Sequence, residues 1–409
     1  MDSLPEPDAA ALAASRTLAR RLNRRIASAG GWIGFDAFMD AALYEPGLGY
    51  YAGGAVRFGP AGDFETAPGI SPLYGACVAR QCLQWLDHVP AEIYEFGAGT
   101  GQLAAQVLNE LARHGRDDVC YRIVEVSAAL RAQQAHTIGT IAPEALGRVQ
   151  WLDALPERFS GLVIGNELLD AVPVRLFALS QSRFFERGVV QDPQAIGGFA
   201  WADRPAGPAF EQSVRASLAQ AGWGGGDPDD LRLDAWPDGY HSEYAERADA
   251  WLLTIGERLE TGAVLLVDYG FPASEFYHPQ RHRGTLVCHY RHRVHDDPLR
   301  LVGLQDVTAH VDFTRLDLVA SVAGMRCLGY TSQANFLLNC GLLEALSEVS
   351  ESTSGAQQAY LRQAQAVQTL VSEAEMGELF KVIAFGRSMP DEAIGFERGD
   401  RRGALACAG

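Results

Sequence analysis

Short apolar segments alternate with helical segments along much of the chain, and this alternation constrains the fold more than any other feature. Apolar runs with strand character lie at 93–96, 121–124, 149–151, 161–164, 264–267, 325–330 and 380–385. Strands that are separated by helices pair in parallel and bury both faces beneath those helices. The sequence therefore predicts an α/β fold, with a Rossmann-like sheet and helices on both faces.

Interruptions in the alternation predict how the chain divides. With 409 residues it is longer than a single core usually supports. Residues 1–88 are expected to form an N-terminal helical and lid region, which starts with an amphipathic helix over about 8–29. The sheet domain is expected at 89–175 and 256–387, and a disordered tail at 388–409. The interrupting segments are expected to be insertions that form a substrate-binding subdomain, at 176–255 and 271–313.

A glycine-rich turn follows the first strand of the predicted sheet, in the order Glu95-Phe96-Gly97-Ala98-Gly99-Thr100-Gly101. Glycines at a strand-to-helix turn let the backbone approach a ligand closely. A dinucleotide site needs the spacing GxGxxG, whereas the spacing here is GxGxG with Gln102 in the sixth position. Glu95 would also repel a pyrophosphate, and it suits a ligand that carries a cationic amine and a sulfonium.

Acidic residues follow the next two predicted strands. Glu125 ends the second strand, where a carboxylate can bind both hydroxyls of a ribose. Asp153 follows the third strand and is placed to reach an adenine amino group. A structural glycine turn with solvated acids is the competing interpretation, but the coincidence of three strand-end acids favours a cofactor site.

Several further motifs resemble those of the MidA family of class I S-adenosylmethionine-dependent methyltransferases, in a consistent order over roughly residues 30–387. They are Tyr44-Glu45-Pro46, Gly49-Tyr50-Tyr51, Gly62-Asp63-Phe64, Thr66-Ala67-Pro68, Asn166 to Val174, Asp268-Tyr269-Gly270, Gly284-Thr285-Leu286, Gln305 to Thr308, His310 to Phe313 and Met376 to Lys381. The resemblance implies S-adenosylmethionine as cofactor and methylation of a protein arginine. Mitochondrial members are associated with complex I assembly, which implies a respiratory-chain subunit as partner; a homodimer is the assembly to test.

The segment after the fourth strand is the candidate acceptor site, because open α/β sheets bind ligands at the carboxyl ends of their strands. Asn166 is expected beside the cofactor. Glu167 and Asp170, three residues apart, are expected on one side of a helical turn that Pro173 ends. Carboxylates there could orient a guanidinium and support its proton loss. A helix cap is the alternative role for Asp170.

Residues upstream of the sheet are expected to close the site. Asp63, with Glu65, lies in a glycine-rich segment that could fold over the cofactor as a lid, and Asp63 is a third candidate catalytic carboxylate. A surface loop with turn acids is the other interpretation. Tyr50 and Tyr51 are expected to line the acceptor channel, unless they serve only in packing.

Composition excludes some classes of function and favours others. The net charge is −17, which argues against nucleic acid and suits a basic partner, although it also serves solubility. Seven scattered cysteines lack a CxxC pair. Six histidines between His278 and His310 are interleaved with arginines, so we expect no metal site. No apolar run is long enough for a membrane span and no leader is evident, so we expect a cytoplasmic protein.

Three functions remain open on these grounds. The first is methyl transfer to a protein arginine. The second is methyl transfer to a small molecule or to another kind of atom. The third is a cofactor-binding assembly factor that grips a partner without catalysis. A dehydrogenase is disfavoured by the glycine spacing.

Overall fold

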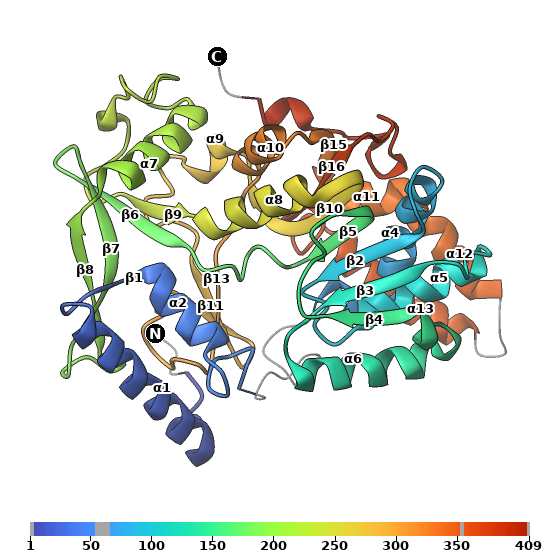
Figure 1. Ribbon diagram of the computed structural model, residues 1–409, viewed down its shortest axis with the longest axis horizontal. Coiled ribbons are helices and arrows are strands. Elements are labelled where there is room, and N and C mark those ends of the chain that lie inside the picture. The colour runs from blue at the N-terminus through green and yellow to red at the C-terminus, as the bar shows by residue number, and fades with distance from the viewer. Residues whose placement is uncertain (1–3, 54–65, 352–355, 407–409) are drawn as a thin grey trace.

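The computed structural model describes residues 4–53, 66–351 and 356–406. Within these residues, eight strands form one large sheet in the order β15-β16-β10-β5-β2-β3-β4, with β14 beside β10 (Figure 1). Their bounds are β2 (Glu92–Phe96), β3 (Cys120–Val124), β4 (Val149–Leu152), β5 (Phe159–Asn166), β10 (Leu259–Phe271), β14 (Val311–Asp312), β15 (Arg326–Ser332) and β16 (Phe380–Arg387). The pairs from β10 to β4 are parallel, whereas β16 runs antiparallel to both neighbours. The predicted α/β sheet is confirmed.

Side chains alternate between the two faces of this sheet. In β10, Leu265 and Val267 belong to one buried cluster, while Val264 and Leu266 belong to another. The first cluster is covered by α4 (Pro72–Leu86), α5 (Gln102–Arg113), α6 (Ala128–Ile141), α11 (Gln333–Asn339), α12 (Leu342–Glu351) and α13 (Ala356–Val371). The second is covered by α8 (Glu246–Arg258) and α10 (Phe313–Val322). Burial on both faces explains why the strands are apolar throughout.

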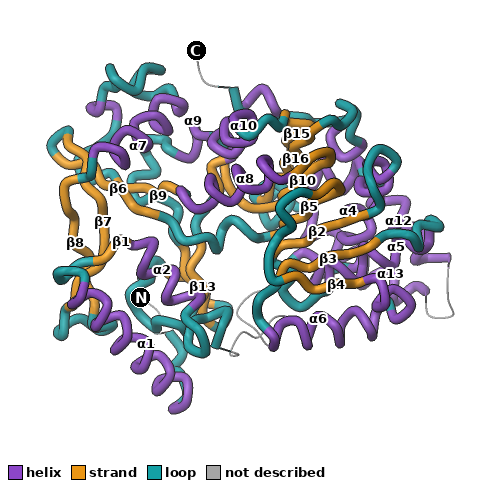
Figure 2. Tube along the Cα trace, in the orientation of Figure 1, coloured by secondary structure: helices purple, strands orange, loops and turns teal. Residues whose placement is uncertain are grey.

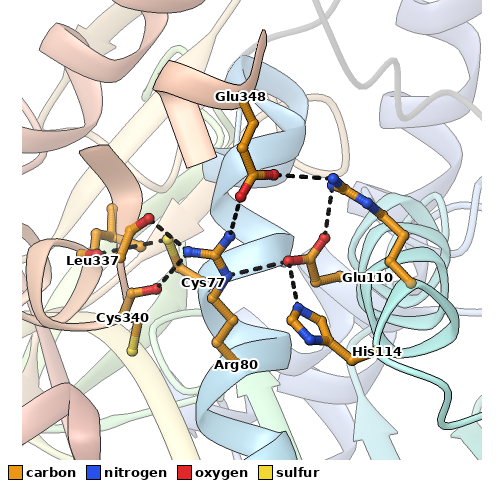
Figure 3. Close-up of polar contacts among 9 residues, drawn as sticks. Cys77, Arg80, Glu110, His114, Leu337, Cys340 and Glu348 are labelled. Carbon is orange, nitrogen blue, oxygen red and sulfur yellow. Dashed lines mark hydrogen bonds and ion pairs between the residues drawn. The ribbon is translucent and has the colours of Figure 1, made fainter. Parts of the chain in front are cut away.

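A partly buried charge network joins three of the helices on the first face (Figure 3). Arg80 of α4 is 17% exposed and lies 3.1 Å from the carboxylate of Glu110 on α5. It also donates 2.7 Å to the carbonyl of Gly341, just before α12, and lies 3.7 Å from Glu348 within that helix. The partly buried Arg80 guanidinium thus links α4 to α5 and α12.

A second, antiparallel sheet, which we call the inserted sheet, has the order β1-β7-β6-β9 with β8 beside β7, and all its strands except β1 come from residues 175–244 (Figure 2). Its strands are β1 (Ile33–Gly34), β6 (Arg175–Ser180), β7 (Arg183–Gln191), β8 (Phe199–Pro205) and β9 (His241–Tyr244). The helices α1 (Ala9–Ser28), α2 (Phe35–Tyr44) and α7 (Pro208–Ala221) lie on it. A small third sheet contains β11 (Val287–Tyr290), β12 (Arg293–His295) and β13 (Asp306–Thr308). The short helices α3 (Ala67–Ile70) and α9 (Ala273–Phe276) complete the described α-helices.

Two boundaries differ from the expected ones. The N-terminal region is not one unit, because α1 and α2 pack with the inserted sheet whereas α4 packs on the large sheet. The expected disordered tail is also wrong for residues 388–406. Phe396 is 5% exposed and its ring lies 5.7 Å from that of Phe336, and the Arg401 amide donates 2.6 Å to the Tyr330 carbonyl. A few apolar side chains pack this polar segment against the rest of the protein. Its composition alone does not predict that packing. Residues 407–409 lie outside the described residues.

Candidate functional site

The loops after β2, β3, β5 and β10 meet at one edge of the large sheet, because these strands are parallel. The glycine turn follows β2, and its three glycines have φ of +66° at Gly97, +50° at Gly99 and +84° at Gly101. These left-handed values strain any residue with a Cβ. A Cβ on Gly97 would also lie 3.0 Å from Leu168. The turn thus presents bare backbone at the beginning of α5, as the sequence predicted.

Glu95 lies directly before the turn, where the expected cationic ligand would need it. Its side chain is 2% exposed, and one carboxylate oxygen accepts a hydrogen bond of 2.9 Å from the Tyr121 hydroxyl. Burial raises the pKa of Glu95 to about 7, and the Tyr121 bond opposes this rise. No described arginine or lysine forms an ion pair with Glu95. A positively charged ligand above the turn would compensate its charge.

Glu125 follows β3 and lies beside the turn. One of its oxygens accepts 2.7 Å from the Ser127 amide and the other accepts 3.5 Å from Gln134 on α6. The next residue, Val126, is apolar yet 79% exposed. An exposed valine beside a carboxylate provides one surface for an apolar ring and one for hydroxyl groups. Sequence reasoning missed Val126, because its exposure is a property of the fold.

Asp153 follows β4, as expected, but its side chain is 89% exposed and lies 2.6 Å from Arg131. A contact between Asp153 and adenine remains a prediction. The Asp153 carboxylate would have to bind the adenine amino group and Arg131 at the same time. Asn166, expected beside the cofactor, instead binds residues of the acceptor side. It donates 3.1 Å to Glu167 and accepts a short hydrogen bond from the Tyr74 hydroxyl.

The segment after β5 is not helical, so the expected helical turn at Glu167 to Asp170 is wrong. Glu167 has a φ of +50°, which ends the strand and turns the chain sharply. Its amide donates 2.8 Å to the Val267 carbonyl of the neighbouring strand. Asp268 caps the turn, since one of its oxygens accepts from the Leu169 amide at 2.8 Å and the Asp170 amide at 3.2 Å. Asp170 is therefore not the cap.

Glu167 and Asp170 nevertheless lie together, and Asp268 joins them. Asp170 is 6% exposed and Asp268 is 1% exposed. Burial, with the nearby Asp170 charge, raises the pKa of Glu167 to about 8. Burial also raises the pKa of Asp170 to about 6 and that of Asp268 well above its usual range. None of the three forms an ion pair with a described residue, and Asp170 Oδ1 has no hydrogen-bond partner there. We call these three residues the carboxylate group.

Aromatic residues from the N-terminal region border the carboxylate group. The Tyr51 hydroxyl donates 2.9 Å to Asp306 of β13, and the Tyr44 hydroxyl donates 3.0 Å to the Ala171 carbonyl. The Tyr44 and Tyr51 rings stack 5.5 Å apart. Asp306 is 3% exposed and its charge also raises the pKa of Glu167. The expected place of Tyr51 in an acceptor channel stays a prediction, whereas Tyr50 is 2% exposed and packs in the core.

The remaining candidates lie elsewhere. Asp63 and Glu65 are outside the described residues. The histidines spread over separate structures: His278 packs on Trp223 with ring centroids 4.5 Å apart, and His310 packs on Tyr269 at 5.0 Å. Among the described residues, no three or more histidine, cysteine or acidic side chains are placed to hold a metal ion. No described helix is long and apolar enough to span a membrane.

The sheet and the site together define a class of protein. A parallel α/β sheet with a glycine turn after the first strand and carboxylates at successive strand ends is the arrangement expected for class I S-adenosylmethionine-dependent methyltransferases. Residues 77–331 match the family model described as "Putative S-adenosyl-L-methionine-dependent methyltransferase". This match covers more than half of the chain, so the chain belongs to that family. It is an S-adenosylmethionine-dependent methyltransferase, as the sequence predicted.

Relatives and solved structures agree with this assignment. The chain is 48% identical to a Burkholderia thailandensis protein crystallised with S-adenosyl-homocysteine, with a TM-score of 0.88 and coverage of 98% of this chain and 99% of that one. It is 27% identical to the mitochondrial protein arginine methyltransferase NDUFAF7 of Danio rerio, over 90% of this chain and 86% of the relative. The Drosophila melanogaster homologue is 28% identical, over 93% and 87%.

These names contradict one expectation from the sequence. The relatives are named mitochondrial, which points to the mitochondrion, so the expected cytoplasmic location is wrong. That expectation rests on the charges near the first residue and on the lack of a long apolar run. Neither property reports the compartment in which a folded domain works.

Proposed function

We propose that this methyltransferase modifies a guanidinium nitrogen of an arginine in a protein. The carboxylate group carries the proposal, because two buried acids, Asp170 and Asp268, and the partly buried Glu167 have no positive partner among the described residues. The names of the relatives, which are protein arginine methyltransferases, support the same acceptor. When bound, the cofactor supplies the electrophilic methyl group.

A guanidinium suits the carboxylate group for electrostatic reasons. Burial raises the pKa of Glu167 to about 8, with a smaller contribution from the Asp170 charge, and burial raises the pKa of Asp170 to about 6. A cation between them would lower both pKa values and restore the ionised carboxylates. The planar guanidinium offers five N–H donors, and Asp170 Oδ1 has an unused acceptor. A small neutral acceptor would leave these carboxyl groups without a positive partner.

The chemistry assigns each carboxylate a task. A free guanidinium is protonated and is a poor nucleophile. Glu167 and Asp170 would bind its far nitrogens, draw the positive charge towards themselves, and accept the proton that transfer releases. Asp268 would hold the turn between them through its bonds to the Leu169 and Asp170 amides. Asp63, which is outside the described residues, remains a candidate for a further catalytic carboxylate.

Residues around the glycine turn would bind the cofactor. The described residues fit it, since bare backbone at Gly97 to Gly101, the Glu125 carboxylate and the exposed Val126 lie together at one edge. Glu95 would compensate the cationic amino-acid end, and Glu125 would bind the ribose hydroxyls. Asp153 would reach the adenine. Asn166 would position Glu167 beside the methyl group.

A polypeptide acceptor agrees with the surroundings of the site. The net charge of −17 favours a basic segment, and the inserted sheet extends the walls of the protein beyond the sheet edge. Following the family resemblance, a respiratory-chain subunit is the first acceptor to test. A homodimer is the assembly to test, by light scattering.

The experiment is transfer of labelled methyl groups to a lysate from cells that lack this protein. We expect labelled protein bands, whose loss with Glu167→Gln would link the label to the carboxylate group. Label found solely in small molecules would favour the small-molecule alternative. Two results together would favour the assembly factor. The unaltered chain would label no protein, and cells that carry Glu167→Gln would still assemble the partner.

A further inference from the structure

Gln134 is a fully buried residue of α6 that lies beneath the carboxyl edge of the large sheet, at 0% exposure. We propose that Gln134 is a positioning residue for the cofactor, because its side chain joins the three segments that would bind it. The inference rests on the proposed cofactor site. It adds to that site a residue that does not contact the cofactor. Its role is to fix the glycine turn and the Glu125 carboxylate relative to each other before the cofactor arrives.

Every polar atom of the Gln134 amide has a partner. Its nitrogen donates 3.1 Å to the Gly99 carbonyl in the turn and 3.5 Å to Glu125 after β3. Its oxygen accepts 2.9 Å from the indole N–H of Trp151 in β4. The two acceptors face the nitrogen and the donor faces the oxygen, so only one orientation of the amide satisfies all three contacts.

Packing and charge make the arrangement rigid. A Cβ on Gly101 would lie 3.0 Å from the Gln134 backbone, so the turn rests directly on α6. One Glu125 oxygen is held by the Ser127 amide at 2.7 Å and the other by Gln134. The 2.7 Å bond from Ser127 orients the carboxylate, and the longer 3.5 Å contact with the buried Gln134 favours the same orientation towards a ribose. Preorganisation of this kind raises affinity by reducing the ordering cost of binding.

A second side chain of α6 also contacts the segments at this edge, but its ion pair is exposed to solvent. Arg131, one turn before Gln134, donates 2.6 Å to the Glu125 carbonyl and forms an ion pair with Asp153 at 2.6 Å. Arg131 is 28% exposed and Asp153 is 89% exposed, so solvent screens that pair. Gln134 has no such access to water. Its removal leaves the Gly99 carbonyl and the Trp151 indole without a partner.

The experiment is titration calorimetry of S-adenosyl-homocysteine with the full chain. Gln134→Met keeps the volume and removes all three hydrogen bonds, and Gln134→Glu keeps the shape and the acceptor for Trp151 but removes both donors. We expect both variants to bind about tenfold to a hundredfold more weakly. The matched control is Gln133→Met, one residue earlier on the exposed side of α6, and it should bind normally.

Thermal unfolding without ligand separates positioning from general stability. Unchanged affinity in Gln134→Glu, or a lower unfolding temperature with unchanged affinity in Gln134→Met, would overturn the inference. In a double-mutant cycle with Glu125→Gln, we expect losses that do not add, because Gln134 acts through that carboxylate. Fully additive losses would contradict this. If Glu125→Gln alone has no effect, the proposed ribose contact fails, which is a result distinct from failure at Gln134.

Discussion

Replacing Glu167 by glutamine should stabilise the protein and inactivate it at the same time. Burial and the Asp170 charge raise the pKa of Glu167 from 4.5 to about 8 in the folded chain. The folded protein therefore holds this proton more tightly than the unfolded chain does. Stability is then lost as the pH rises from about 4.5 to about 8, because the unfolded chain ionises first.

The size of the effect follows from the two pKa values. Each pH unit between them is worth about 1.4 kcal/mol, so the ionised carboxyl costs on the order of a few kcal/mol above about pH 8. Glutamine carries no charge, and its oxygen can still accept from Asn166 and the Ala67 amide. The free energy of unfolding should thus rise at about pH 8 and stay close to the original value at about pH 5.

The assay combines urea unfolding at both pH values with transfer of labelled methyl groups. We expect methyl transfer to fall by about ten- to ten-thousand-fold, the usual contribution of one positioned electrostatic or acid–base group. S-adenosyl-homocysteine affinity should not change. The matched control is Glu257→Gln, an exposed carboxylate on α8 that should alter neither property. A glutamine variant that is less stable at about pH 8, or that transfers at full rate, would refute the argument.

Three further predictions concern the rest of the site. Glu125→Gln should weaken cofactor binding by about 1–3 kcal/mol in calorimetry, and no change would mean that the ribose lies elsewhere. Gly99→Val should abolish cofactor binding, because φ is +50° there and a side chain would intrude, while circular dichroism shows an intact fold. Transfer by the unaltered protein at low acceptor concentration should rise with pH through about 6 as Asp170 ionises and again through about 8 as Glu167 ionises, and Asp170→Asn should remove the lower step; an unchanged pH profile would contradict this role.

The sheet and the cofactor turn could be predicted from the sequence because their signals are local. Apolar runs of the right length, separated by helical periodicity, specify strands, and the glycines of the turn lie within five positions from Gly97 to Gly101. The apolar runs, the helical periodicity and the glycine turn all indicate the same fold. The positions of Glu95 and Glu125 at strand ends therefore followed from the predicted strands.

The acceptor side could be predicted only in part, because its residues meet through long-range pairing. Asp268 reaches the turn at Leu169 because β10 pairs with β5, and the sequence separates these residues by about a hundred positions. The acidic spacing of Glu167 and Asp170 suggested a helix, whereas the backbone of Glu167 is left-handed. Gln134 carries no motif, since a buried amide in a helix is recognised only by its partners.

The chemical nature of the modified residue tests the central claim most directly. A protein acceptor labelled with the methyl group should be hydrolysed to amino acids, and the labelled amino acid identified by mass spectrometry. The carboxylate group predicts methylarginine, and at least about tenfold less label when Glu167→Gln is the enzyme. Label on lysine, on a carboxyl group or on a hydroxyl group would contradict a site built for a guanidinium.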